Sequence, residues 1–295
     1  MHVGGKTTSN VKMGKVSMVS IIFLVATFPN HICSQNKTSD YYDLCKPFPC
    51  GNITFSFPFS PTSEFGLGPL DCGLPRYQIA CDSGPAIELS GRLFSVKQLS
   101  LSADFNSITV VDHQLITDLT SRSCESLRNL SISTFDVAPL TLPSWGVNLT
   151  LYRCPSGLSL SQQQQFLSTL LNNFSYTCQD GDKLHLAREV RWNDTQFDPP
   201  RLSPVLPPPP TGCQFFSLPV SRTFLNSSGG ENGILLNPSF EASELIPVLR
   251  EGFPLEWPTV GVCESCKSKG GRCGYDISSR EVVCFCRTGS CQQVL

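Results

Sequence analysis

Cysteine density constrains this chain more than any other feature of its sequence. The chain has 15 cysteines in 295 residues, and six of them fall between Cys263 and Cys291. Such a density predicts a disulfide framework, which forms in an oxidising compartment. The alternative is a cytosolic zinc protein, but its thiolate ligands would need a reducing compartment.

The N-terminus favours the oxidising compartment. Lys6, Lys12 and Lys15 precede an apolar run from Val16 to Phe28, and a short polar stretch follows, which is the order found in signal peptides. The run is shorter than the roughly 20 residues that span a bilayer. We therefore predict that residues 1–34 are a signal peptide. Its removal takes away Cys33 and leaves an even number of cysteines, which permits seven bridges. The cysteines predicted to form disulfides are Cys45, Cys50, Cys72, Cys81, Cys124, Cys154, Cys178, Cys213, Cys263, Cys266, Cys273, Cys284, Cys286 and Cys291.

Asn-x-Ser/Thr triplets add independent support for secretion. Any single triplet is a weak signal, but several in a chain with a predicted leader indicate a largely sugar-coated surface. Asn237 is excluded because Pro238 follows it. The predicted N-glycosylation sites are Asn36, Asn52, Asn129, Asn148, Asn173, Asn193 and Asn226.

Length and charge exclude some classes of partner. Residues 35–295 are long enough for one large or two modest domains. They carry 19 Lys and Arg against 24 Asp and Glu, a net charge of −5. Bulk charge therefore offers no attraction for nucleic acid or an anionic membrane. No later segment is apolar over the length of a membrane span or a lipid-anchor tail, so we expect the mature protein to be secreted.

The hydrophobic pattern predicts a mainly β, disulfide-rich fold with a few short helices. Ile53, Phe55, Phe57 and Phe59 alternate with polar residues, as strands do. Strands are also predicted near residues 77–81, 93–101, 107–111, 147–151 and 174–178.

Two helices are predicted in the second half of the chain. The first covers residues 161–174, whose apolar positions recur at helical spacing. Its four glutamines could instead be a low-complexity tract, although a run this short is more typical of an exposed first turn. The second covers residues 241–250, with Gly252 placed as a C-cap.

Cysteine parity suggests where the domains divide. Residues 198–210 hold seven prolines and look like a linker, but a division there would leave seven mature cysteines on each side. A division between Cys81 and Cys124 gives four and ten, if no bridge joins the modules. We therefore predict one module at residues 35–115 and a second at 116–295 that carries the proline run as an exposed loop. The gaps between the last six cysteines resemble those of a growth-factor-like module.

Motifs in the first half resemble a known plant family. Residues 45–53 read Cys-Lys-Pro-Phe-Pro-Cys-Gly-Asn-Ile, residues 55–59 read Phe-Ser-Phe-Pro-Phe, and residues 71–77 read Asp-Cys-Gly-Leu-Pro-Arg-Tyr. This pattern resembles the galacturonan-binding ectodomain module of plant wall-associated kinases.

The second half resembles the C-terminal module of the same kinases. The matching features are Glu-Gly-Phe at 251–253, Trp257, Cys-x-x-Cys at 263–266 and Gly-Gly-x-Cys-Gly at 270–274. Both modules occur in leaf-rust-resistance-type receptor-like kinases, in which a transmembrane helix and a serine/threonine kinase domain follow. This sequence ends at Leu295, so the resemblance implies a receptor ectodomain or a secreted ectodomain-like protein, with no catalysis by these residues.

The resemblance implies binding to pectin, a polymer of galacturonate. Carboxylates of such a ligand would need guanidinium groups, ammonium groups or bridging calcium, and no other cofactor or metal is expected. The candidate ligand-binding residues are Arg76, Tyr77, Arg92 and Lys97, because basic and aromatic side chains meet there. The competing interpretation is that these cations lie on solvated strand faces and that the aromatic rings belong to the core.

Two further classes of function compete with glycan binding. The protein could be a secreted decoy or co-receptor that binds a receptor ectodomain or a peptide through a face without glycans. An enzyme fits less well, because only His113 and His185 remain after the leader. The sequence also lacks a Gly-x-Ser-x-Gly elbow and the kinase motifs, and its acids form no distinctive pair for glycoside hydrolysis.

Overall fold

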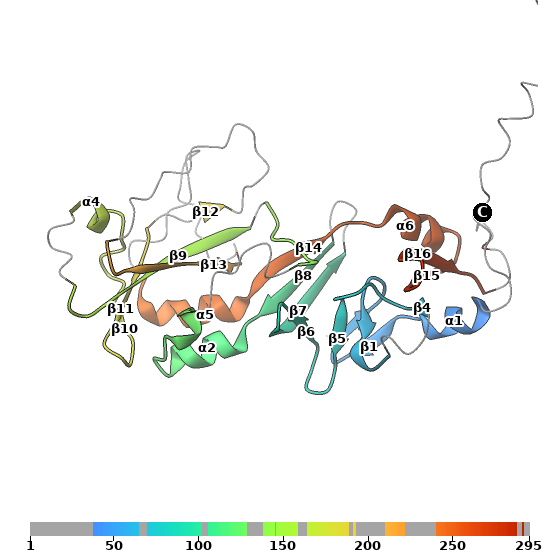
Figure 1. Cartoon of the computed structure of the whole chain (residues 1–295), viewed down its shortest axis with the longest axis horizontal. Helices are drawn as coiled ribbons and strands as arrows, with labels where there is room; N and C mark the ends of the chain where they lie inside the picture. The colour runs from blue at the N-terminus through green and yellow to red at the C-terminus, as the bar shows by residue number, and fades with distance from the viewer. Residues whose placement is uncertain are drawn as a thin grey trace, which may run out of the picture.

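The structure is a computed structural model that describes residues 38–64, 70–101, 106–128, 138–144, 146–158, 164–188, 191–192, 210–221, 240–287 and 291. The predicted signal peptide, residues 198–209 of the proline-rich loop, and Asn36, Asn129, Asn193 and Asn226 lie outside these ranges. The molecule is elongated, with its sheets following one another along the long axis (Figure 1). No helix among the described residues has the length and apolar character needed to cross a bilayer.

Strands dominate the described residues, as the hydrophobic pattern predicts. They are β1 (Phe48–Cys50), β2 (Ile53–Phe55), β3 (Ser60–Pro61), β4 (Leu70–Asp71), β5 (Gln78–Ala80), β6 (Ala86–Leu89), β7 (Arg92–Leu101), β8 (Asn106–Val111), β9 (Val147–Cys154), β10 (Tyr176–Thr177), β11 (Lys183–Leu186), β12 (Arg191–Trp192), β13 (Gln214–Val220), β14 (Phe253–Trp257), β15 (Arg272–Asp276) and β16 (Glu281–Phe285). The helices are α1 (Thr38–Leu44), α2 (His113–Thr120), α3 (Glu125–Arg128), α4 (Gln164–Leu167), α5 (Ala242–Glu251) and α6 (Gly261–Ser268), with a 3₁₀ turn at Thr62–Glu64.

A six-stranded sheet lies at the centre of the molecule, in the order β14-β8-β7-β6-β5-β3. Strands β5 to β8 form an antiparallel meander. The distant strand β14 completes the sheet by pairing with β8. One face of the sheet is core, where Val96, Val110 and Phe253 occupy neighbouring positions and are all buried.

The second sheet is built around β9. This strand pairs with β11 and β12 on one side and with β13 on the other, and seven of its eight residues are buried. A strand with neighbours on both edges and cover on both faces is expected to be this deeply buried, and here the buried residues include the polar Thr150 and Arg153. One continuous hydrophobic core joins this sheet to the six-stranded sheet through α2 and α5.

The C-terminal cysteine cluster is a helix packed on a hairpin. Helix α6 lies against β15 and β16 (Figure 1), and β4 adds a third strand beside β15. Gly274 is required at this junction, because a Cβ there would lie 2.6 Å from the Asp71 carbonyl oxygen and 2.2 Å from the Phe285 ring. Helix α1 contacts β16 from the other end of the chain, with the rings of Tyr41 and Phe285 stacked 5.5 Å apart.

Disulfide bonding is confirmed for all fourteen predicted cysteines. In the first part of the chain the pairs are Cys45–Cys72 and Cys50–Cys81, followed by Cys124–Cys178 and Cys154–Cys213. In the C-terminal cluster the pairs are Cys263–Cys273, Cys266–Cys284 and Cys286–Cys291. No thiolate is therefore left among them to hold zinc.

Strand pairing crosses the predicted module boundary at residue 115, whereas disulfide bonding does not. No disulfide joins a cysteine before residue 115 to one after it, and Cys154–Cys213 crosses the proline-rich segment. Strand ladders do cross the boundary, because β14 pairs with β8 and β15 pairs with β4. The division at residue 115 stays a prediction, and the two sides share hydrogen-bonded sheets.

One predicted helix is largely wrong and the other is confirmed. Residues 161–163 of the predicted 161–174 helix lie outside the described residues; of residues 164–174, only Gln164–Leu167 form α4, and Leu170 makes a β-bridge with Ala187. The leucines are buried by partners distant in sequence, which helical spacing alone does not reveal. Helix α5 matches the prediction at 241–250, and Gly252 is its C-cap with φ of 75°.

Candidate functional site

The four predicted ligand-binding residues lie in β7 of the six-stranded sheet or just before β5. Arg76 and Tyr77 precede β5, Arg92 begins β7, and Lys97 lies at an irregularity in β7 between Val96 and Gln98. Each of the four side chains has a different environment.

Tyr77 belongs to the core, and the expectation that its ring stacks on a sugar is wrong. The residue is 4% exposed, and its ring packs edge to face against Phe59 with centroids 5.6 Å apart. Burial raises the pKa of its hydroxyl to about 12. The nearby Phe94 ring is buried as well. All three rings belong to the main hydrophobic core.

Replacing Tyr77 separates a packing role from a ligand role. The hydroxyl makes only a long 3.5 Å contact with the carbonyl oxygen of Pro139, so we expect Tyr77→Phe to change the free energy of unfolding by less than about 1 kcal/mol. Tyr77→Ala should cost about 3–5 kcal/mol, because it leaves a cavity. Chemical denaturation of both variants checks this. A loss of glycan binding in a stably folded Tyr77→Phe protein would instead restore the ligand role.

Arg92 is held by a buried carboxylate. Its guanidinium forms an ion pair with Asp112, whose side chain is 5% exposed. The other oxygen of that carboxylate accepts a hydrogen bond from the backbone N–H of Leu115 at 2.9 Å and caps α2. Arg92 thus links β7 to the start of α2, and a ligand would have to compete with a buried counter-ion for it.

Lys97 is also paired, but at the surface. Its ammonium lies 2.7 Å from the carboxylate of Glu251 and 3.4 Å from the carbonyl oxygen of Arg250, at the end of α5. Both charged side chains are about half exposed, so the pair contributes little to stability. The ammonium remains accessible to an anionic ligand.

Arg76 is the predicted cation with the fewest competing contacts. It is exposed in the turn between β4 and β5, where its φ is 68°. No ion pair or hydrogen bond engages its guanidinium among the residues that the structure describes. Of the four predicted residues, Arg76 is therefore the best placed to meet a carboxylate.

The outer face of the sheet carries hydrogen-bonding side chains. Gln98 lies beside Thr109, and Ser100 lies beside Ser107, which is buried. The Gln98 side-chain amide donates to the Ser100 hydroxyl at 3.3 Å. Amide and hydroxyl groups of this kind can bond sugar hydroxyls. The sequence prediction, based on cations and aromatic rings, missed this face because its signal is only a run of small polar residues at alternate positions.

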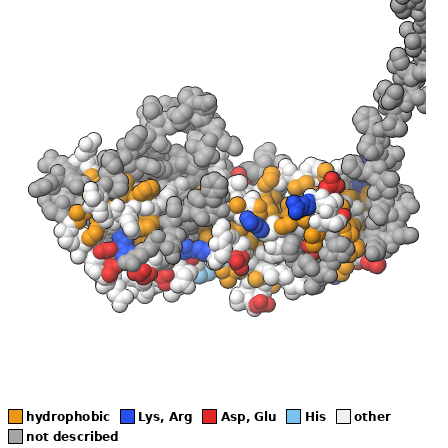
Figure 2. Space-filling model, viewed as in Figure 1, with side chains coloured by type: hydrophobic (Ala, Val, Ile, Leu, Met, Phe, Trp, Pro, Cys, Tyr) orange, Lys and Arg blue, Asp and Glu red, His pale blue; other side chains and the backbone are white. Residues whose placement is uncertain are grey.

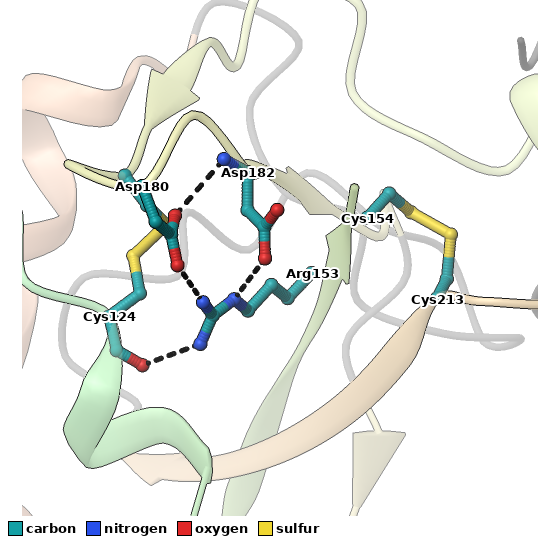
Figure 3. A network of polar contacts seen from close by, with 7 residues as sticks. Cys124, Arg153, Cys154, Asp180, Asp182 and Cys213 are labelled. Carbon is teal, nitrogen blue, oxygen red and sulfur yellow. Dashed lines mark hydrogen bonds and ion pairs between the residues drawn. A yellow bond between two sulfur atoms is a disulfide. The ribbon is translucent and has the colours of Figure 1, made fainter. Parts of the chain in front are cut away.

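A second polar cluster was also missed, and it is structural. Arg153 of β9 is 3% exposed, and its guanidinium donates to Asp182 at 2.7 Å, to the Cys124 carbonyl oxygen at 3.1 Å and to Asp180 (Figure 3). The Cys124–Cys178 disulfide lies beside it. These contacts tie β9 to two loops and leave the guanidinium unavailable to a ligand.

The predicted glycosylation sites differ in accessibility. Asn52 is exposed in the turn between β1 and β2, and Asn173 is exposed in a turn before β10. Asn148 is half-buried within β9, where Arg191 and Pro219 flank it on the neighbouring strands. Glycosylation of these positions stays a prediction, and Asn148 is the least accessible of the three.

Two family models match this chain. Residues 45–112 match the wall-associated receptor kinase galacturonan-binding model, and residues 204–289 match the wall-associated receptor kinase C-terminal model. Both describe ectodomain modules rather than catalytic domains. The first match contains all four candidate residues, and the second contains α5, β14 and the cysteines of the C-terminal cluster as far as Cys286. No solved structure matches the chain.

Curated relatives from Arabidopsis thaliana are receptor-like kinases. The chain is 25% identical over 269 residues to leaf rust 10 disease-resistance locus receptor-like protein kinase-like 1.2, covering 88% of this chain and 34% of the relative. It is 31% identical over 135 residues to the 1.1 protein, covering 45% and 17% respectively. The 2.8 protein is 24% identical over 267 residues, covering 88% and 24%. The chain thus spans about a third or less of each relative's length. The chain therefore carries the galacturonan-binding module and the C-terminal module of wall-associated receptor kinases, in this order, and it is similar to receptor-like kinases of the leaf rust 10 type.

Proposed function

We propose that this protein binds de-esterified pectin outside the cell, as the ectodomain of a receptor-like kinase or as a secreted ectodomain-like protein. The observation that carries the proposal is the match of residues 45–112 to a galacturonan-binding model. The disulfide framework supports an extracellular location, because such bridges persist in oxidising compartments.

Local side chains offset the unfavourable net charge of the mature chain. Arg76 is exposed and its guanidinium has no ion pair or hydrogen bond within the described part of the chain, so it can bind a carboxylate through two parallel hydrogen bonds. Lys97 adds a surface ammonium, and Gln98, Ser100 and Thr109 offer amide and hydroxyl groups on the same sheet. Calcium could bridge carboxylates of the glycan and of the protein, so its contribution needs a separate measurement.

Calorimetric titration of the glycosylated mature protein with oligogalacturonides tests the function. We expect saturable binding to de-esterified oligomers that weakens when the uronates are methyl-esterified, because esterification removes the charge. A neutral glucan is the control for general sugar binding, and titrations with calcium and with a chelator isolate the role of the cation. The proposal fails if oligogalacturonides produce no binding heat under any of these conditions.

Arg76 gives the sharpest single-residue test of the site. We expect Arg76→Gln to weaken oligogalacturonide binding by about 1.5–3 kcal/mol, roughly tenfold or more, since it removes a charge-assisted hydrogen bond. Lys183→Gln on β11 is the matched control, because Lys183 is an exposed cation on a different sheet. Equal affinities for the two variants would place the ligand elsewhere.

A protein partner is the second candidate function. Residues 53–128 and 227–295 contain no glycosylation triplet, and together they form the six-stranded sheet and the C-terminal cluster. Leu93 is 59% exposed on the outer face of this sheet. Basic and hydrophobic side chains lie together on this part of the molecule (Figure 2). Binding to a receptor ectodomain that persists without uronate would favour this alternative.

A further inference from the structure

Two neighbouring disulfides in the C-terminal cluster are in van der Waals contact through their sulfur atoms. Cys266–Cys284 connects α6 to β16, and Cys286–Cys291 follows directly. The sulfurs of Cys284 and Cys291 are 3.5 Å apart, and those of Cys284, Cys286 and Cys291 all lie within 4.8 Å of one another. A thiolate at Cys291 would therefore begin in contact with the sulfur of a neighbouring bridge.

We propose that these four cysteines form a thiol–disulfide exchange site that takes a dithiol as its substrate. The dithiol first reduces Cys286–Cys291 and becomes a disulfide itself, supplying two electrons. The Cys291 thiolate then attacks the Cys284 sulfur, so that a Cys284–Cys291 bond forms and the Cys266–Cys284 bond breaks. The electron pair leaves on Cys266, which takes up a proton. This second step involves no net oxidation or reduction.

Accessibility favours this direction of exchange. Cys291 and Cys284 are half-buried, whereas Cys266 and Cys286 are buried. Attack by an external thiolate on the terminal bridge therefore meets the sulfur of Cys291 first. In the Cys266–Cys284 bridge the Cys266 side is buried, so an external thiolate reaches it poorly. The Cys291 thiolate, once formed, is the nucleophile nearest to the Cys284 sulfur.

The backbone packs closely against the Cys266–Cys284 bridge. A Cβ at Gly271 would lie 2.6 Å from the Cys266 sulfur and 2.7 Å from the Cys284 sulfur, so only glycine fits there. This packing leaves the Cys291 sulfur, 3.5 Å away, in contact with the sulfur of Cys284.

Exchange would break one of the two disulfides that join α6 to the hairpin of β15 and β16. Cys266–Cys284 is the bond between α6 and β16, while Cys263–Cys273 still links α6 to β15. Cys263, Cys266 and Cys273 form a small core against which Phe57 of the galacturonan-binding module packs. The exchange therefore changes the contact between the two modules, whatever ligand the first module binds.

Partial reduction of the mature protein tests the site. The protein is treated briefly with one equivalent of dithiothreitol, quenched with acid and N-ethylmaleimide, and mapped by peptide mass spectrometry. We expect Cys266 and Cys286 to be alkylated in equal amounts, with a new Cys284–Cys291 bond. Alkylation of Cys286 and Cys291 with Cys266–Cys284 intact would overturn the proposal, as would a Cys284–Cys286 bond.

A variant separates internal exchange from direct reduction of the shielded bridge. In the double variant Cys286→Ser, Cys291→Ser the attacking thiol is absent, so we expect alkylation of Cys266 under the same treatment to fall at least tenfold. The far-ultraviolet circular dichroism and the Cys263–Cys273 bond verify that this variant is folded. Equal alkylation of Cys266 in the variant and in the natural sequence would show that the dithiol reaches the shielded bridge directly, and the exchange would be rejected.

Discussion

Replacing Arg153 by methionine is expected to lower the free energy of unfolding by about 3–5 kcal/mol, because it removes three charge-assisted hydrogen bonds made by a buried guanidinium. The guanidinium bonds two carboxylates and one carbonyl oxygen at the junction of β9, the Cys124 loop and the Asp180 turn. Methionine fills part of the volume but leaves Asp180 and Asp182 without their cation. Urea denaturation of the variant and the natural sequence measures the loss as a shift of the midpoint, provided that the slope of the unfolding free energy against urea concentration is unchanged.

Two further variants show whether the loss comes from stranded charges. Asp180→Asn and Asp182→Asn added to Arg153→Met remove the carboxylates as well, so we expect part of the stability to return. Lys97→Met is the matched control at an exposed ion pair and should cost less than about 1 kcal/mol. A similar small effect at Arg153 would mean that the buried network does not stabilise the fold.

Removing the Cys154–Cys213 bridge is expected to have the second large effect. The bridge joins residues 59 apart in sequence, and the chain-entropy model gives about 4 kcal/mol for closing a loop of that length. The double change Cys154→Ala, Cys213→Ala avoids a stray thiol. We expect a lower denaturation midpoint and reduced secretion, because less of the protein would be folded during export.

The Cys286–Cys291 bridge shows how the stability lost on removing a bridge depends on the length of the loop that the bridge closes. Cys286–Cys291 joins residues only 5 apart, for which the same model gives about 2 kcal/mol. The variant Cys286→Ala, Cys291→Ala should therefore be the milder of the two. A reversed order would show that local packing around the bridges outweighs the constraint on the unfolded chain.

Local sequence patterns predicted much of the secondary structure. Alternation at Leu93 to Leu101 matches β7, and the apolar face and terminal glycine of residues 241–252 match α5. The same reasoning failed at residues 168–174, where the leucines keep helical spacing but are buried by partners such as Ala187. Hydrophobic periodicity predicts which side chains are buried, but it does not predict which residues they pack against.

The candidate site shows the same limit. Basic residues and family motifs pointed to the first module, and the match to residues 45–112 confirms its type. Tyr77 looked like a sugar platform because an aromatic residue beside Arg76 has the same sequence signature on either face of a sheet. The Tyr77 ring packs against Phe59, and Phe59 in turn packs against Trp257 of β14. This packing requires β14, which is distant in sequence, to join the sheet beside β8.

Residue types and their spacing were enough to predict the disulfide-rich character and the mainly β fold class, and a resemblance of motifs to a known family predicted the two receptor-ectodomain modules. The cysteine pairing, the ladders between β14 and β8 and between β15 and β4, and the burial of Arg153 follow from the three-dimensional arrangement. It alone brought the sulfurs of Cys284 and Cys291 into contact. These features depend on strand register and on contacts between residues far apart in sequence, for which the local pattern of polar and apolar residues carries no information.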